Sequence, residues 1–189
     1  GLNGSCRQYR AMSPARGRLE LQRLHRWVER CGSFIAVDTL LPPAFVKEVF
    51  PQVPPPPGFR MMYEVRPILN DAQIATLCAA GVAAVQPGIE ALSTSTLKLM
   101  RKGTSAFSNL RFLRHVSRHP LALDWNLLIG SPGELDATFE KYARDLPLLF
   151  HLPPPTGVYP IGFVRHSPYF EDPAAYQLDL APQDFYGFT

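Results

Sequence analysis

The spacing of apolar residues along this chain switches between the helical and the strand pattern. From 13 to 31 they recur every third or fourth position after a Ser-Pro pair, which predicts a helix that Gly32 ends. Residues 59–66 alternate apolar and polar side chains, as in a strand with one buried face. Short apolar runs predict further strands at 34–37, 82–86, 121–129 and 159–164.

Helical stretches separate the predicted strands. Asn70 and Gln73 form a capping-box pattern that opens one helix, and Gly81 closes it. Strands that alternate with helices of this length predict a parallel sheet with right-handed crossovers. We therefore expect an α/β fold, a partial (β/α) barrel with parallel strands. The other helical segments are predicted at 45–50, within 92–103, at 105–118 and at 139–149.

The order of the elements bears on domain organisation. The chain opens on a helix, whereas a parallel barrel normally begins with a strand, so we expect the first barrel strand to be missing. We then expect another copy of the chain, the amino-terminal segment or crystal neighbours to cover the edge near 34–37, and the first of these would make a homo-oligomer through the exposed sheet edge. We predict one domain over 1–189, with strand-helix repeats in 1–152 and the last strand and a C-terminal extension in 153–189.

Composition narrows the class of protein. A chain of 189 residues with 46% hydrophobic residues is globular, and its net charge of +3 comes from scattered Lys and Arg without a stripe that suits nucleic acid. The sequence has no span long enough for a membrane and no secretory signal at its start, so we expect a cytoplasmic protein. Three distant cysteines, Cys6, Cys31 and Cys78, indicate free thiols and no metal site.

Two predicted strands end in glycine, proline and an acidic residue, and these ends are the candidate chemistry. Gln86-Pro87-Gly88 and Glu90 follow one strand, and the same pattern recurs at 130–134. Proline removes an amide donor, and glycine allows a ligand to approach the backbone. Ligands bind at the carboxyl ends of strands in barrels and open α/β sheets, so both segments point to one binding face.

An ordered set of motifs closely resembles radical S-adenosylmethionine enzymes. Within them, the sequence is most similar to the cobalamin-binding subgroup associated with the maturation of ribosomally made peptides. Each motif alone is weak, but the set runs through nearly the whole chain in the right order. The motifs are GLNG at 1–4, AVD at 36–38, YEV at 63–65, QPGIE at 86–90, LKLMRKG at 97–103, WNLLIG at 125–130 and SPYF at 167–170.

The resemblance implies a fragment of a larger enzyme. In that family a loop with the cysteine spacing CxxxCxxC holds a [4Fe-4S] cluster just before GLNG, and this chain begins directly after it. We therefore expect S-adenosylmethionine as the cofactor of this chain, with the cluster and cobalamin belonging to the full-length protein only. The implied reaction is cleavage of S-adenosylmethionine to a radical, followed by methyl transfer to an unactivated carbon of a peptide or another small organic substrate. The chain alone would be inactive.

The resemblance also implies roles for individual residues. Glu90 matches the position expected to bind the ribose or the methionyl part of S-adenosylmethionine, and Asp38 a position for the methionyl amine. Arg66 could pair with the methionyl carboxylate, or it could be an ordinary residue of the solvated surface. Glu90 could instead cap the following helix. The turn that approaches adenine corresponds to Gly130, Pro132 and Gly133, and the remaining cofactor-binding residues are Glu64, Gln86, Gly88 and Asn126. No catalytic residue is assigned.

Two other classes of function remain open at this point. The partial barrel could be an interaction module that binds a peptide along its open edge, or a small enzyme that uses Asp38, Glu64 and Glu90 for acid-base chemistry. The same resemblance extends to magnesium-protoporphyrin monomethyl ester cyclases, and nothing in the sequence favours a porphyrin over a peptide. Nucleic-acid and membrane partners are not expected.

Overall fold

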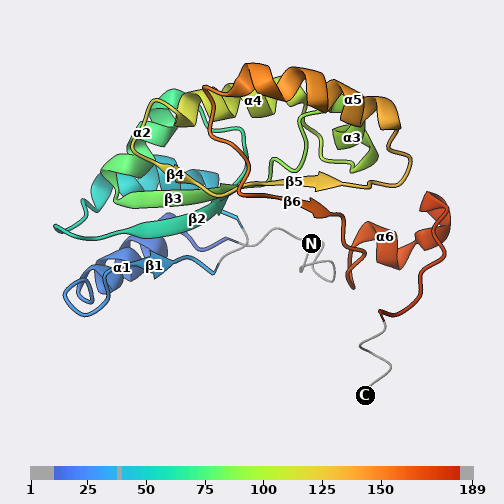
Figure 1. The fold of residues 1–189 in the computed structure, drawn as a ribbon. Coiled ribbons are helices and arrows are strands. Elements are labelled where there is room, and N and C mark those ends of the chain that lie inside the picture. Colours follow the sequence, from blue (N-terminus) through green and yellow to red (C-terminus); the bar gives the residue numbers. More distant parts are fainter. Residues whose placement is uncertain (1–10, 38–39, 184–189) are drawn as a thin grey trace.

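A computed structural model describes residues 11–37 and 40–183 of the chain. Figure 1 shows α2, α4 and α5 together on one side of the strands. The strands are β1 (Phe34–Ile35), β2 (Met61–Val65), β3 (Val82–Pro87), β4 (Ala122–Leu123), β5 (Asn126–Ile129) and β6 (Gly157–Pro160). The α-helices are α1 (Pro14–His25), α2 (Asp71–Ala79), α3 (Thr94–Leu99), α4 (Ala106–Val116), α5 (Asp136–Asp145) and α6 (Pro168–Glu171). Short π or 3₁₀ segments are η1 (Phe45–Val49), η2 (Phe50–Gln52), η3 (Leu146–Leu149) and η4 (Pro173–Tyr176).

All strand pairs are parallel, which confirms the predicted α/β class. One sheet has the order β1-β2-β3-β4, and β5 pairs with β6 in a second. A bridge between Glu90 and Leu127 joins the second sheet to the segment after β3, and the Leu128 amide donates to the Glu90 carbonyl at 2.8 Å. Neighbouring strands along the chain are therefore neighbours in space, as in a barrel segment.

The local patterns in the sequence form the expected elements. In β2, Met61, Tyr63 and Val65 are buried, which confirms the alternation predicted for this strand. The capping box of α2 is present, because the Gln73 amide donates to Asn70 Oδ1 at 3.0 Å and the Asn70 amide to Gln73 Oε1 at 3.0 Å. On the opposite face of β2, Glu64 is exposed.

The single strand predicted over 121–129 is wrong. The structure divides it into β4 and β5 at Asp124 and Trp125. The Asp124 amide still donates to the Val85 carbonyl at 3.0 Å, but the Trp125 carbonyl accepts from the Thr156 amide at 2.7 Å, so the chain has turned toward β6. The buried Trp125 ring stabilises this change of partner, since its Nε1 donates to the Pro153 carbonyl at 3.1 Å.

Two boundaries and one helix type also differ from the sequence expectations. The last strand spans Gly157–Pro160 instead of 159–164, because its partner β5 ends at Ile129 and the backbone turns at Gly130, where φ is 76°. The first α-helix ends at His25, and turns replace the predicted helix up to 31. The helical face at 45–50 is buried as predicted, but it belongs to η1 and η2 rather than to an α-helix.

The outer strand of the first sheet, β1, leaves apolar side chains open to solvent. Ile35 on β1 and Val37 just after it are 71% and 95% exposed. Among the described residues, no helix has both the length and the apolar character needed to cross a membrane.

Candidate functional site

A cavity of about 550 Å³ lies where β2 and β3 end. Its wall comes from the ends of these two strands and the residues just after them, the start of β5, the segment that follows α3, and Leu40. The carboxyl ends of parallel strands meet at one edge of a sheet, which explains why residues far apart in sequence converge here. The cavity therefore lies at the edge where the sequence predicts a ligand.

Six of the ten predicted cofactor-binding residues line this cavity. Asp38 lies outside the described residues. The turn with Gly130, Pro132 and Gly133 is not part of the cavity wall, although it follows the strand that supplies Asn126. The six residues that the structure brings together are Glu64, Arg66, Gln86, Gly88, Glu90 and Asn126.

Glu90 occupies an unusual backbone conformation. Its φ is 59°, in the left-handed region that side chains other than glycine rarely adopt. Two tight turns produce this geometry, since the Ile89 amide donates to the Pro87 carbonyl at 2.8 Å and the Ala91 amide to the Ile89 carbonyl at 2.7 Å. Such conformations cost about 1 kcal/mol or more and persist only where the surroundings hold them, which happens most often at functional sites.

Two buried side chains hold this turn. Asn109 of α4 donates from Nδ2 to the carbonyls of Ile89 and Ala91, at 3.0 and 2.9 Å. Tyr142 of α5 accepts from the Leu92 amide through its hydroxyl at 3.1 Å. Burial raises the pKa of Tyr142, and the Leu92 amide opposes this shift. The residues before and after Glu90 are thus fixed from the helix layer.

The carboxylate of Glu90 has a cationic partner at the cavity. Glu90 Oε1 accepts from Lys102 Nζ at 2.8 Å, and the two side chains are 22% and 37% exposed. Gly88 lies beside the pair, and a Cβ there would make an ordinary van der Waals contact with Glu90 Oε1 at 3.5 Å. The alternative that Glu90 caps the next helix is wrong, because Ser93 is the N-cap of α3 and its hydroxyl accepts from the Thr96 amide.

Three polar residues of the wall, Arg101, Lys102 and Thr104, were not among the predicted site residues. They belong to or follow the LKLMRKG motif, and the signal for them was this motif with its two cations before a glycine. The chain turns sharply here, with φ of 53° at Arg101 and 65° at Gly103. The Arg101 guanidinium lies 5.1 Å from the ring centre of Tyr176, so the C-terminal segment packs beside the cavity.

The glycine turn after β5 is closed by its own glutamate. Glu134 Oε2 accepts from the amides of Gly130 and Ser131 at 2.9 and 3.1 Å. The other oxygen of this carboxylate accepts from the Thr96 hydroxyl at 2.8 Å. Glu134 therefore fixes the turn to α3 and does not cap α5, whose N-cap is Leu135. The role of this turn in binding adenine stays a prediction.

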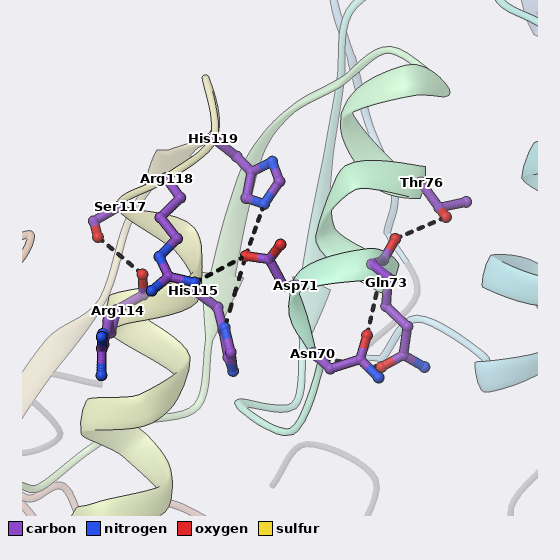
Figure 2. A network of polar contacts seen from close by, with 10 residues as sticks. Asn70, Asp71, Gln73, Thr76, Arg114, His115, Ser117, Arg118 and His119 are labelled. Carbon is purple, nitrogen blue, oxygen red and sulfur yellow. Dashed lines mark hydrogen bonds and ion pairs between the residues drawn. The ribbon is translucent and has the colours of Figure 1, made fainter.

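A second polar cluster lies between α2 and α4 (Figure 2). Asp71 Oδ1 is 3.2 Å from His119 Nε2, 3.7 Å from His115 Nδ1 and 3.9 Å from an Arg118 guanidinium nitrogen. Both histidines are partly buried in this cluster, with side chains that are 23% and 16% exposed. None of these residues lines the cavity, and the described part of the chain holds no group of three His, Cys, Asp or Glu residues suited to a metal ion.

The chemistry of the cavity wall decides which cofactors the described residues fit. The wall contains carboxylates, amides, a threonine and three cations, which match the ammonium, carboxylate and hydroxyl groups of S-adenosylmethionine. Its described residues include no cysteine or histidine. Cys31 is exposed and Cys78 is half-buried in α2, so the described residues do not supply the thiolates of an iron-sulfur cluster.

Comparisons with known proteins agree with the fold. No protein-family model matches the sequence, and no curated protein matches it. The structure is similar to OxsB, a cobalamin-dependent S-adenosylmethionine radical enzyme, with aqua-cobalamin bound: the TM-score is 0.62 and the identity 16%, over 88% of this chain and 26% of that one. For OxsB with aqua-cobalamin and S-adenosylmethionine bound, the TM-score is 0.62 and the identity 15%, over 90% and 27% of the two chains.

A third structure extends the likeness. The archaeal Methanocaldococcus infernus Elp3 with an N-terminus deletion has a TM-score of 0.55 and 14% identity, over 87% of this chain and 47% of that one. The chain spans about a quarter of the length of the OxsB structures. At these identities the likeness concerns the fold alone: this chain has a partial (β/α) barrel fold similar to that of these structures.

Proposed function

We propose that the cavity at the ends of β2 and β3 binds S-adenosylmethionine. The observation that carries the proposal is the convergence of Glu64, Gln86, Glu90 and Asn126 on one cavity, within a fold similar to that of OxsB. A carboxylate has about four acceptor positions, so Glu90 keeps acceptor capacity for ribose hydroxyls or an ammonium group while it pairs with Lys102.

The cations of the wall complement this role. Arg66, Arg101 and Lys102 surround the same cavity, and a guanidinium is suited to bidentate contact with a carboxylate such as that of the methionyl group. Lys102 is already engaged by Glu90, which leaves Arg66 and Arg101 as the candidate partners of that carboxylate. The expected role of this chain is to bind S-adenosylmethionine and to orient it.

The activity that we propose for the whole protein is that of a cobalamin-dependent radical S-adenosylmethionine methyltransferase. Its proposed substrate is a ribosomally made peptide, modified at an unactivated carbon. The radical and methyl-transfer chemistry belongs to the cofactors of such an enzyme. Because the described residues supply no cluster ligands, we assign none of the reaction steps to them.

The test is a calorimetric titration of three proteins with S-adenosylmethionine: the chain itself, Glu90→Gln and Asp71→Asn. Both substitutions remove one carboxylate charge at nearly constant volume, but only Glu90 lines the cavity. We expect the chain and Asp71→Asn to bind with similar affinity, and Glu90→Gln to bind at least about tenfold more weakly, a loss of roughly 1.4 kcal/mol. Absence of binding by the unmodified chain, or equal affinity of all three proteins, would contradict the proposal.

A second candidate function is an interaction surface at the edge strand β1. The exposure of Ile35 on β1 and of Val37 just after it favours this candidate, since exposed apolar side chains at an open sheet edge promote pairing with another chain. We propose a second copy of this chain as the partner. Light scattering after size exclusion should detect a dimer that Ile35→Lys reduces and that Val158→Lys, on β6, leaves intact. A monomer at all concentrations would exclude this candidate.

A further inference from the structure

Asn109 is a fully buried polar side chain outside the cavity. It lies on α4, is 0% exposed, and its neighbours on the same helix face are Phe112, Leu113 and Val116. Polar side chains in such a core are rare unless their hydrogen bonds are needed. The residue therefore calls for an explanation in terms of what it binds.

Both hydrogen bonds of Asn109 go to the backbone that flanks Glu90. Nδ2 donates to the Ile89 carbonyl at 3.0 Å and to the Ala91 carbonyl at 2.9 Å. Ile89 and Ala91 are fully buried, so these carbonyls have no access to bulk water as an alternative partner. One amide nitrogen with two hydrogens thus spans the residue whose φ is 59°.

The acceptor side of the same amide is not used. Asn109 Oδ1 is buried and has no hydrogen-bond partner among the described residues. A buried unpaired acceptor lowers stability, so the benefit of an asparagine here comes from its two donors. An aspartate offers no donor when ionised and at most one when protonated, and leucine has none at all.

We infer that Asn109 is a positioning residue of the proposed site: its side-chain amide holds the left-handed turn that directs Glu90 into the cavity. The inference rests on the proposed role of Glu90 as a ligand contact. Asn109 does not line the cavity, so its effect on a ligand must act through Glu90. Small misplacements of a binding group lower affinity strongly, which gives this indirect role a measurable size.

The experiment is a double-mutant cycle with Asn109→Leu and Glu90→Gln, read by titration with S-adenosylmethionine. We expect Asn109→Leu to weaken binding at least about fivefold, and to have no further effect when Glu90→Gln is already present. A purely structural role would weaken binding by the same factor in both backgrounds, and that result would overturn the inference. Val116→Ala is the matched control: it opens the same helix face, should lower the melting temperature, and should change the affinity less than about twofold.

Asn109→Asp provides a second route, because it keeps the size of the side chain if the leucine variant fails to fold. A ligand-independent measurement separates this inference from the proposed function. We expect Asn109→Asp to shift the amide resonances of Ile89, Glu90 and Ala91 and to speed their hydrogen exchange, whereas Val116→Ala leaves these amides unchanged. If the unmodified chain fails to bind S-adenosylmethionine, the proposed function fails, and these resonances still decide whether Asn109 holds the turn. Unchanged resonances in Asn109→Asp would overturn the inference.

Discussion

Glu90 and Asp71 are two carboxylates that face cationic groups, but the chain holds them in different ways. Asp71 is the first residue of α2, has a side chain that is 49% exposed, and faces His115 of α4 and His119, which follows that helix. Glu90 is 22% exposed and sits in a left-handed turn. A carboxylate in the first turn of a helix is stabilised by the helix dipole, and this local effect is enough to account for the position of Asp71.

The turn at Glu90 has no such local explanation. Its backbone conformation is unfavourable, and buried groups from two other helices, Asn109 and Tyr142, hold it. When distant buried partners hold a residue in an unfavourable backbone conformation, the direction in which its side chain points is functionally important. Both carboxylates lie near basic side chains, so their charged neighbours do not distinguish them. Their backbone conformations do: Glu90 belongs to a candidate site, and Asp71 to a structural ion cluster.

The largest expected effect comes from a substitution in α4, the helix that contacts both the Glu90 turn and Asp71. Helix α4 carries Asn109 toward the Glu90 turn and His115 toward Asp71, and the Phe112 ring between them is 1% exposed. Phe112→Ala should lower the free energy of unfolding by about 3–5 kcal/mol, because it leaves a cavity in the core. Urea denaturation measures this loss, and a loss below about 1 kcal/mol would show that α4 is not the common support.

A smaller effect compares the backbones at the two carboxylates. At position 90 a glycine variant should be more stable than an alanine variant by about 1 kcal/mol, because glycine adopts positive φ without strain. At position 71, in a helix, the order should reverse, with Asp71→Ala more stable than Asp71→Gly. Chemical denaturation of the four variants gives both differences, and the same order at both positions would refute the distinction.

The smallest effect concerns His25, which forms no ion pair with a carboxylate among the described residues. The ring of His25 packs edge-on against Phe59 at 4.5 Å, and burial lowers its pKa below its ordinary value of 6.5. The folded state then binds fewer protons than the unfolded state, so stability falls as the pH drops below 6.5 and levels off below the folded-state pKa. His25→Gln should reduce this slope between about pH 7 and pH 5. If the slope of stability against pH is unchanged in His25→Gln, other titrating groups cause the loss of stability.

Local chemistry made much of the fold predictable. The alternation in β2 and the capping box at Asn70 and Gln73 depend on neighbours within a few residues, and both form as predicted. The division of the strand at Trp125 was not predictable, because it depends on Pro153 and Thr156, which lie about thirty residues later. Periodicity detects an apolar run but not the strand with which it pairs.

The site shows the same limit. The motif around Glu90 drew attention to the right strand end, but Asn109 lies in the middle of an amphipathic helix, where it resembles an ordinary polar residue. Its contacts reach back 20 and 18 positions in the sequence. The left-handed φ of Glu90 was equally hidden, since glycine is the usual marker of that conformation and here it stands two positions earlier, at Gly88.

The bridge between Glu90 and Leu127 has a mechanical consequence. The carbonyl of Glu90 accepts the amide of Leu128, so a backbone bond connects the candidate site to the β5–β6 pair. Under a pulling force applied through β6, tension passes from β6 to β5 and then to this carbonyl. The turn that carries the carboxylate thus lies on the load path between the two sheets.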